Sequence, residues 1–96
     1  MQYLYKERYL KRFDRFPHHE QALIHQTDQQ IHTYYDTRQA PVGLHIKRLY
    51  ATGPDRIFEA RVSRAIRIVW AERGEMVSFL LIGSHDDVKR YLRSLR

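Results

Sequence analysis

The segment RIFEARVSRAIRIVWAERGEMVSFLLIG, residues 56–83, decides the fold because it reads as three consecutive strands. Residues 56–63 and 65–72 alternate between the two faces of a strand, with apolar side chains recurring on one face. Residues 75–83 are apolar on both faces, which is typical of a central strand that is covered on both sides. Arg73-Gly74 supplies a tight turn before that strand. We therefore predict a small sheet in the second half of the chain.

The side-chain pattern also predicts the register of the first hairpin. If residues 63–65 form a three-residue loop, Val62 faces Ile66 and the apolar side chains of both strands share the core side. The same register places Arg61 opposite Arg67 on the other face. A two-residue loop would instead pair Val62 with Arg67 and turn an arginine toward the core. Because only the three-residue loop keeps Arg67 away from the core side, we predict that loop.

Two arginines that face each other repel, and an anion between or above them relieves the repulsion. Arginine is also the residue best suited to bidentate contact with phosphate, so Arg61 and Arg67 are candidates for phosphate binding. The alternative is two solvated arginines that pair with Glu59 or Glu72.

The first half of the chain reads as helical. Residues 2–5 form a short opening strand, and from Lys6 the apolar residues follow helical spacing as far as Phe16. Pro17 fits the first turn of a second helix, which ends near Asp36. That helix carries one apolar side, formed by Leu23, Ile24, Thr27, Ile31, Tyr34 and Tyr35. Two consecutive helices with one apolar stripe each predict a helical hairpin.

Two further segments complete the fold. Residues 43–50 have a mixed hydrophobic period, and we interpret them as a loop or short turn that docks on the core. Residues 84–96 begin with a helix cap at Ser84 or His85, followed by two aspartates that suit the positive end of a helix. We predict one α+β domain over residues 1–96: a small antiparallel or mixed twisted sheet of about four strands on an N-terminal helical hairpin, with a short C-terminal helix.

Composition restricts the function. The chain has 96 residues, no cysteine and a net charge of +6, with a pI near 9.9. The lack of cysteine excludes a disulfide scaffold and any cysteine-ligated zinc or iron–sulfur site. The positive charge favours a polyanionic partner such as RNA. No signal peptide and no apolar run of transmembrane length occur, so we expect a cytoplasmic protein that does not contact membranes.

Most histidines offer no metal site, because His18, His19, His25 and His32 lack further ligands at convincing spacing, and we expect them on an exposed helix face. We expect no metal and no other cofactor. Trp70 is interpreted as a core residue. His85 follows the last strand, and its ring should project from the end of the sheet. Histidine is the natural general acid or base near neutral pH. The alternative role of His85 is that of a neighbour of the helix cap.

The order of elements and three segments resemble the RelE/ParE family of type II toxins of bacterial toxin–antitoxin systems. The segments are GLHIKRL (43–49), IFEARVSRAIRIVW (57–70) and VSFLLIGSHDDVKRYL (77–92). Family members carry an acidic-x-Arg strand, then a strand with an internal arginine, then an apolar strand that ends at a basic or histidine residue. The resemblance covers nearly the whole chain, and its specific part is residues 58–92.

The resemblance implies a toxin that cuts messenger RNA in the ribosomal A site without a metal. A base activates the ribose 2′-OH, arginines stabilise the charged phosphorane, and an acid protonates the departing 5′-oxygen. The catalytic positions that the resemblance implies are Arg67, His85, Tyr91 and Arg61. Lys47, Arg48 and Arg64 are further candidates for RNA binding. Phe58 and Ala60 occupy positions where RelE itself has lysines, so the base is unassigned.

The resemblance also implies a partner, a cognate antitoxin that forms a hetero-oligomer with the toxin. We expect an acidic, disordered antitoxin segment that folds over the Arg61/Arg67 face. Its candidate apolar anchors are Leu80, Ile82, Val69, Tyr34 and Tyr35, unless these residues are core under the terminal helix. Two alternative functions stay open: a ParE-like toxin that poisons DNA gyrase, and a basic RNA- or protein-binding module without catalysis.

Overall fold

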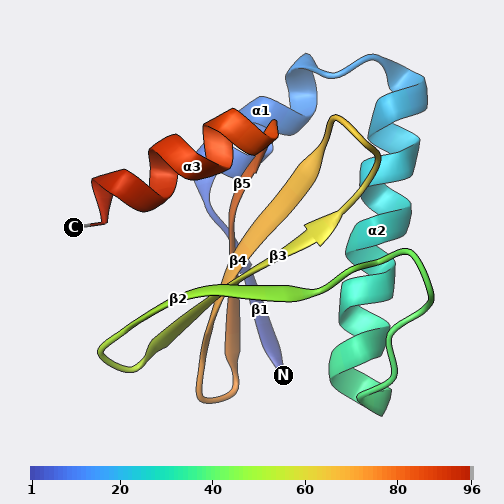
Figure 1. The fold of residues 1–96 in the computed structure, drawn as a ribbon. Coiled ribbons are helices and arrows are strands. Elements are labelled where there is room, and N and C mark those ends of the chain that lie inside the picture. Colours follow the sequence, from blue (N-terminus) through green and yellow to red (C-terminus); the bar gives the residue numbers. More distant parts are fainter. Residues whose placement is uncertain (96) are drawn as a thin grey trace.

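The computed structural model describes residues 1–95, which form a five-stranded sheet and three helices (Figure 1). The sheet has the strand order β1-β5-β4-β3-β2, in which β1 runs parallel to β5 and the other neighbours are antiparallel. The elements in chain order are β1 (Gln2–Tyr5), α1 (Glu7–Arg15), α2 (His18–Thr37), β2 (Lys47–Thr52), β3 (Asp55–Arg61), β4 (Arg67–Arg73), β5 (Met76–Gly83) and α3 (His85–Ser94). The predicted α+β class is confirmed.

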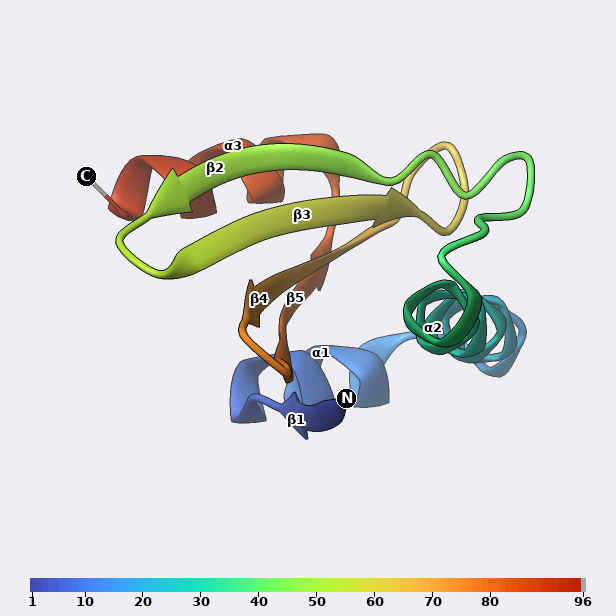
Figure 2. The ribbon, with the colours of Figure 1, turned by 90° about the horizontal axis from the view of Figure 1, so that it is seen from below.

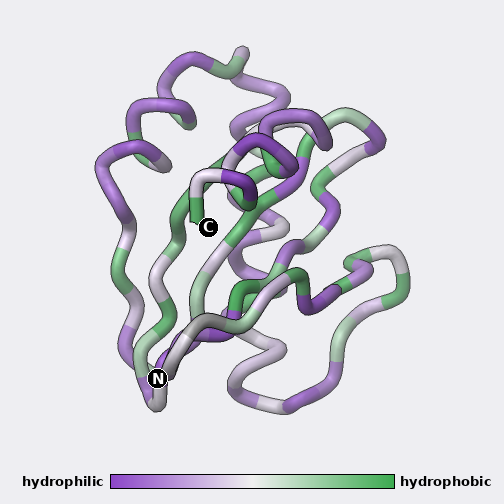
Figure 3. Tube along the Cα trace, turned by 60° about the vertical axis from the view of Figure 1, so that its left-hand side comes forward, coloured by the Kyte–Doolittle hydropathy of each residue, from purple (hydrophilic) through white to green (hydrophobic). Residues whose placement is uncertain are grey.

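The helices cover the sheet on both faces, and each face has its own apolar core. Figure 2 shows α1 and α2 on one side of the sheet and α3 on the other. The larger core joins Tyr9, Ile24 and Ile31 of the first two helices to Trp70 and Phe79 of the sheet. The smaller core lies under α3, where Val88 packs on three strand residues, Ile57, Val69 and Leu81. In Figure 3 the hydrophobic stretches accordingly concentrate in the strands and the hydrophilic ones in the helices.

The predicted register of the β3–β4 hairpin is confirmed. Phe58 pairs with Trp70, Ala60 with Ile68, and Arg61 with Arg67. The backbone N–H of Val62 donates to the carbonyl oxygen of Ile66 at 2.9 Å, which closes the three-residue loop. The rings of Phe58 and Trp70 stack with their centroids 5.8 Å apart on the side of the larger core.

The sheet has five strands instead of about four, because residues 47–52 form β2 where we expected a loop or short turn. The N-terminal part of that segment does dock on the core, since Leu44 is buried. The register between β2 and β3 shifts between Arg48 and Tyr50. A bulge of this kind inserts one residue and breaks the alternation of side chains, so the strand shows a mixed hydrophobic period.

A second register shift, between Val69 and Trp70, separates apolar residues that simple alternation places on one face of β5. Val69 pairs with Leu81 under α3, whereas Ile82 joins Val77 and Phe79 in the larger core. Val69 and Ile82 are fully buried, and Tyr35 is nearly so. The prediction that these residues form an exposed anchor for an antitoxin is therefore wrong, because they are core on one or the other face of the sheet.

His32 is also placed differently from the prediction of an exposed helix face. Its ring stacks on Tyr3 with centroids 3.7 Å apart, and it lies 3.0 Å from the Tyr5 hydroxyl and 3.2 Å from Asp28. This aromatic stack joins α2 to β1 and continues to Phe79 of β5. Burial and the hydrogen bond to Asp28 raise the pKa of Tyr5. His32 is thus part of the packing between helix and sheet.

Among residues 1–95, no helix is both long enough and apolar enough to cross a membrane.

Candidate functional site: an arginine-bearing sheet face beside the start of α3

Four charged side chains lie on the sheet face that carries α3, and we call this set the arginine face: Lys47, Glu59, Arg61 and Arg67. Lys47 pairs with Glu59 across β2 and β3, and Arg61 pairs with Arg67 across β3 and β4. Directly opposed residues of antiparallel strands project from the same face, and residues two apart on one strand do the same. The register therefore brings all four side chains to one side of the sheet.

Arg67 is held by Glu59. One guanidinium nitrogen of Arg67, Nη1, donates to Glu59 Oε2 at 3.2 Å, and the two side chains are only 17% and 9% exposed. The Nε of Arg67 is buried and has no hydrogen-bond partner among the described residues. A buried donor without a partner is costly, so Arg67 carries an unsatisfied polar atom in this part of the sheet. Of the two alternatives for Arg67, phosphate binding and pairing with a neighbouring acid, the contact with Glu59 favours the pairing. The pair is shielded from solvent, whereas the sequence suggested solvated arginines.

The start of α3 lies next to the arginine face, because Arg67 pairs with Gly83 at the end of β5. Ser84 caps the helix: its hydroxyl accepts from the Asp87 backbone N–H, and the Asp87 carboxylate accepts from the Ser84 backbone N–H. His85 follows as the first helical residue and is exposed. The predicted cap is confirmed at Ser84, and the exposed His85 is the neighbour of that cap.

Asp87 fixes this junction from three sides. Besides the Ser84 contacts, its carboxylate accepts from Arg12 at 2.7 Å and from Arg90 at 3.2 Å. The hydrogen bond from the Ser84 backbone, aided by Arg12 and Arg90, lowers the pKa of Asp87. A Cβ on Gly83 would lie 2.8 Å from the Asp87 Cβ, so only glycine allows this close approach. The position of His85 therefore depends on Gly83, Ser84 and Asp87.

The remaining candidates are dispersed. Arg48 pairs with Phe58, whose ring packs against the larger core, so Arg48 belongs to the opposite face from Lys47. Arg64 is exposed in the β3–β4 loop, near the end of the sheet where Arg67 begins β4. Tyr91 is half-buried in the smaller core, and the guanidinium of Arg8 lies 5.6 Å from its ring centroid. Tyr91 thus faces α1.

Sequence reasoning noted Glu59 only as a pairing partner and did not assign it to the site. Nothing in the sequence indicated its burial, because Glu59 lies on the face opposite Phe58 and Ala60, and that face is covered only when α3 packs on the sheet. The arginines of α1 were not assigned to the site either, although one of them, Arg12, contacts Asp87 there.

Among residues 1–95, no group of three or more His, Asp or Glu side chains is arranged to hold a metal ion. The candidate site consists of two arginines, one carboxylate, one lysine and one histidine.

Comparison with known proteins gives structural likeness only. No family model matches the chain, and no curated protein matches it. Three solved structures do match. The archaeal RelE–RelB complex from Pyrococcus horikoshii matches with a TM-score of 0.68 and 12% identity, over 86% of this chain and 92% of that chain.

A copper-bound mutant toxin from Helicobacter pylori matches with a TM-score of 0.67 and 17% identity, over 92% of this chain and 98% of that chain. The RelB–RelE antitoxin–toxin complex from Methanococcus jannaschii matches with a TM-score of 0.63 and 16% identity, over 92% and 96% of the two chains. Since each match spans nearly the whole of both chains, the protein has the fold of the RelE-type toxins.

Proposed function

We propose that this protein is the toxin of a toxin–antitoxin pair and that it cleaves messenger RNA on the ribosome. The observation that carries the proposal is the row Arg61–Arg67–Gly83, in which two arginines pair across neighbouring strands and Arg67 pairs with the strand end that leads to His85. The RelE-type fold supports the same reading, although a fold alone hosts many functions.

The chemistry that these residues support is transfer of the phosphate from the 5′-oxygen to the 2′-oxygen. The 2′-oxygen loses its proton and forms a bond to phosphorus, and the bond from phosphorus to the 5′-oxygen breaks. The products are a 2′,3′-cyclic phosphate and a free 5′-hydroxyl. Arg61 and Arg67 supply positive charge for the phosphorane, because charge that develops in the transition state is stabilised by fixed donors.

His85 is the candidate acid for the 5′-oxygen, since it is exposed just after the last strand and imidazole is the side chain best suited to general acid–base catalysis. The geometry assigns no base for the 2′-hydroxyl, because Glu59 is engaged with Arg67. Lys47 lies opposite Glu59 and offers a further cation for the RNA backbone.

The test is induction of the protein in bacterial cells, with mapping of messenger RNA ends by primer extension. We expect growth arrest with new cuts in phase with codons, which disappear in His85→Ala and in Arg67→Ala. His18→Ala is the matched control for His85, because His18 is likewise the exposed first residue of a helix. Arg56→Ala is the control for Arg67, as an exposed arginine on β3.

Intact growth without new cuts would contradict the proposal. Growth arrest without cuts but with DNA breaks trapped on gyrase would favour a ParE-like toxin instead. Toxicity or RNA binding that is equal in wild type, His85→Ala and Arg67→Ala would favour a module that binds without catalysis.

The second part of the proposal is the antitoxin partner. Two of the structurally similar proteins are toxins in complex with antitoxins, named RelB in both cases. The net charge of +6 favours an acidic segment as partner through faster association. Co-purification with the product of a neighbouring gene, followed by hydrogen exchange, would test this, and we expect added protection at residues 57–72, 77–83 and 85. Absence of added protection there would contradict this placement.

A further inference from the structure

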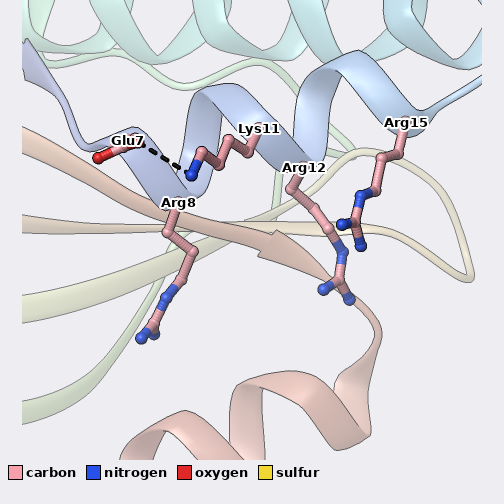
Figure 4. Close-up of a pocket in the computed structure, with 5 residues that line it drawn as sticks. All are labelled: Glu7, Arg8, Lys11, Arg12 and Arg15. Carbon is pink, nitrogen blue, oxygen red and sulfur yellow. Dashed lines mark ion pairs between the residues drawn. The ribbon is translucent and has the colours of Figure 1, made fainter.

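The α1 helix carries an arginine stripe that the proposed chemistry does not use, made of Arg8, Arg12 and Arg15. Figure 4 shows the three side chains extending from the same side of α1, while Lys11 turns toward Glu7. Their spacing of four and three residues puts them on one helical face. At about 1.5 Å of rise per residue, the stripe is about 10 Å long.

The arginine stripe borders a shallow groove between α1 and α3. Arg8 and Arg12 line this groove from α1, and Arg90 and Tyr91 line it from α3, with Leu81 of β5 and Asp87 beside them. The guanidinium of Arg8 lies over the Tyr91 ring at 5.6 Å, which orients it by a cation–π contact. Arg12 is oriented by Asp87 at 2.7 Å. Two of the three arginines are therefore held in place before any partner binds.

The groove leads to the proposed site. Arg12 and Arg15 also line a neighbouring depression with Ile66, Gly83 and Ser84. Ile66 directly precedes Arg67, and Ser84 directly precedes His85. Arg12 and Arg15 thus bring the stripe to the end of the sheet where the arginine face lies, beside a depression that is otherwise lined mainly by apolar residues and by Glu20 and Asp87.

We propose that the arginine stripe binds the phosphate backbone of a structured RNA, at a surface separate from the residues that would cleave. A rigid row of guanidiniums suits the regular row of phosphates on one RNA strand, and arginine contacts phosphate through two parallel hydrogen bonds. Around the stripe, the four cationic side chains of α1 stand against two carboxylates, that of Glu7, which pairs with Lys11, and that of Asp87, which pairs with Arg12.

An acidic protein segment is the competing partner, and the groove suits it less well. Protein partners gain most of their affinity from apolar anchors in pockets. The only aliphatic residue that lines the groove between α1 and α3, within residues 1–95, is Leu81, which is 5% exposed. The large apolar side chains that are exposed, such as Leu4, Leu23 and Val42, do not line it. A groove lined mainly by fixed charge, with the half-buried Tyr91 and the buried Leu81 as its apolar contacts, fits an RNA backbone better than a protein segment.

The test measures binding of a fluorescein-labelled RNA hairpin of arbitrary sequence, by anisotropy over a series of salt concentrations. The variant is Arg8→Gln with Arg15→Gln, which leaves Arg12 and its contact with Asp87 intact. The control is Arg56→Gln with Arg93→Gln, which removes the same charge from two exposed residues outside the groove. Thermal unfolding of both variants checks that they fold.

We expect the stripe variant to weaken hairpin binding about 10- to 50-fold near 0.1 M salt and to reduce the salt slope by about 1.4 to 1.8, because each of the two lost phosphate contacts contributes about 0.7 to 0.9. The control should change both values much less. Equal effects in the two variants would overturn the proposal, since only net charge would then matter. A larger effect on binding of a polyglutamate peptide than on the hairpin would also overturn it, in favour of an acidic protein partner.

This result does not depend on cleavage. If cells show no cuts but the stripe variant loses hairpin binding, the proposed nuclease function fails while the RNA surface stands. If cuts occur and the stripe variant binds the hairpin like the wild type, the proposed nuclease function stands while the proposed RNA surface fails.

Discussion

The carboxylate of Glu59 contacts the guanidinium of Arg67 at 3.2 Å, on adjacent strands and with both side chains largely shielded from water. Most ion pairs on protein surfaces contribute little to stability, whereas breaking a shielded pair leaves one charge without compensation. The pair therefore ties a candidate catalytic arginine to the stability of the sheet.

We predict that Glu59→Gln lowers the free energy of unfolding by about 2 kcal/mol, because Arg67 then stays shielded without its counter-charge. Urea denaturation measures the change. Asp55→Asn is the control, since it removes the partner of Arg73 in a more exposed pair, and it should cost less than about 1 kcal/mol. Equal losses in the two variants would show that the Glu59–Arg67 pair is no better shielded in solution than a surface pair.

The indole N–H of Trp70 donates to the Tyr35 hydroxyl at 2.7 Å, in the larger core. We predict that Tyr35→Phe costs about 1–3 kcal/mol, because the fully buried Trp70 nitrogen loses its acceptor. Tyr34→Phe removes the same atom from the neighbouring, only half-buried tyrosine and should cost much less. Thermal unfolding followed by tryptophan fluorescence compares the two. A loss that is as large for Tyr34→Phe would contradict the role of this hydrogen bond.

The register shift in β5 makes a prediction that simple alternation does not. Alternation places Leu80 and Ile82 on one face, whereas the structure buries Ile82 completely and leaves Leu80 half-buried. Ile82→Ala should cost about 2–5 kcal/mol, as large-to-small changes in a core do, and Leu80→Ala clearly less. Denaturant midpoints at constant slope give the comparison. Similar costs would mean that β5 has no bulge at this point.

The lowered pKa of Asp87 predicts a dependence of stability on acid. A carboxyl whose pKa is lower in the folded state stabilises the fold above its ordinary value of 3.8, and this contribution is lost as the pH falls below that value toward the folded-state pKa. Asp87→Asn should cost about 1 kcal/mol near pH 7, as loss of a helix cap does, and should make the loss of stability below pH 4 less steep. Asp86→Asn, a change at the neighbouring exposed aspartate, is the control and should leave the slope unchanged.

How much of this structure follows from sequence depends on how local the deciding contacts are. The β3–β4 register followed from parity alone, because a slip by one residue would turn Arg67 into the core. The cap at Ser84 followed from four consecutive residues. In contrast, β2 was predicted as a loop, and Leu80 and Ile82 were predicted on one face of β5. Both predictions were wrong because bulges near Leu49 and Leu80 break the alternation of side chains along the strand.

The site was predictable to the same extent. The pairing of Arg61 with Arg67 was read from the hairpin, and the position of His85 from the end of a strand. The contact of Arg12 with Asp87 and the stack of His32 on Tyr3 join segments far apart in the chain. The spacing of residues in the sequence does not predict such contacts, since they depend on how α1 and α2 pack on the folded sheet.

The parallel pairing of β1 with β5 has a consequence for the order of folding. Tyr3 pairs with Val77, so the first strand has no place in the sheet until the last strand exists. A nascent chain that stops before residue 76 also lacks Gly83, the neighbour of Arg67, and the helix that begins with His85. Closing so long a loop is slow, because contacts distant in sequence form late. A protein proposed to attack translation would thus remain harmless to the ribosome that is synthesising it until nearly the whole sheet had been made.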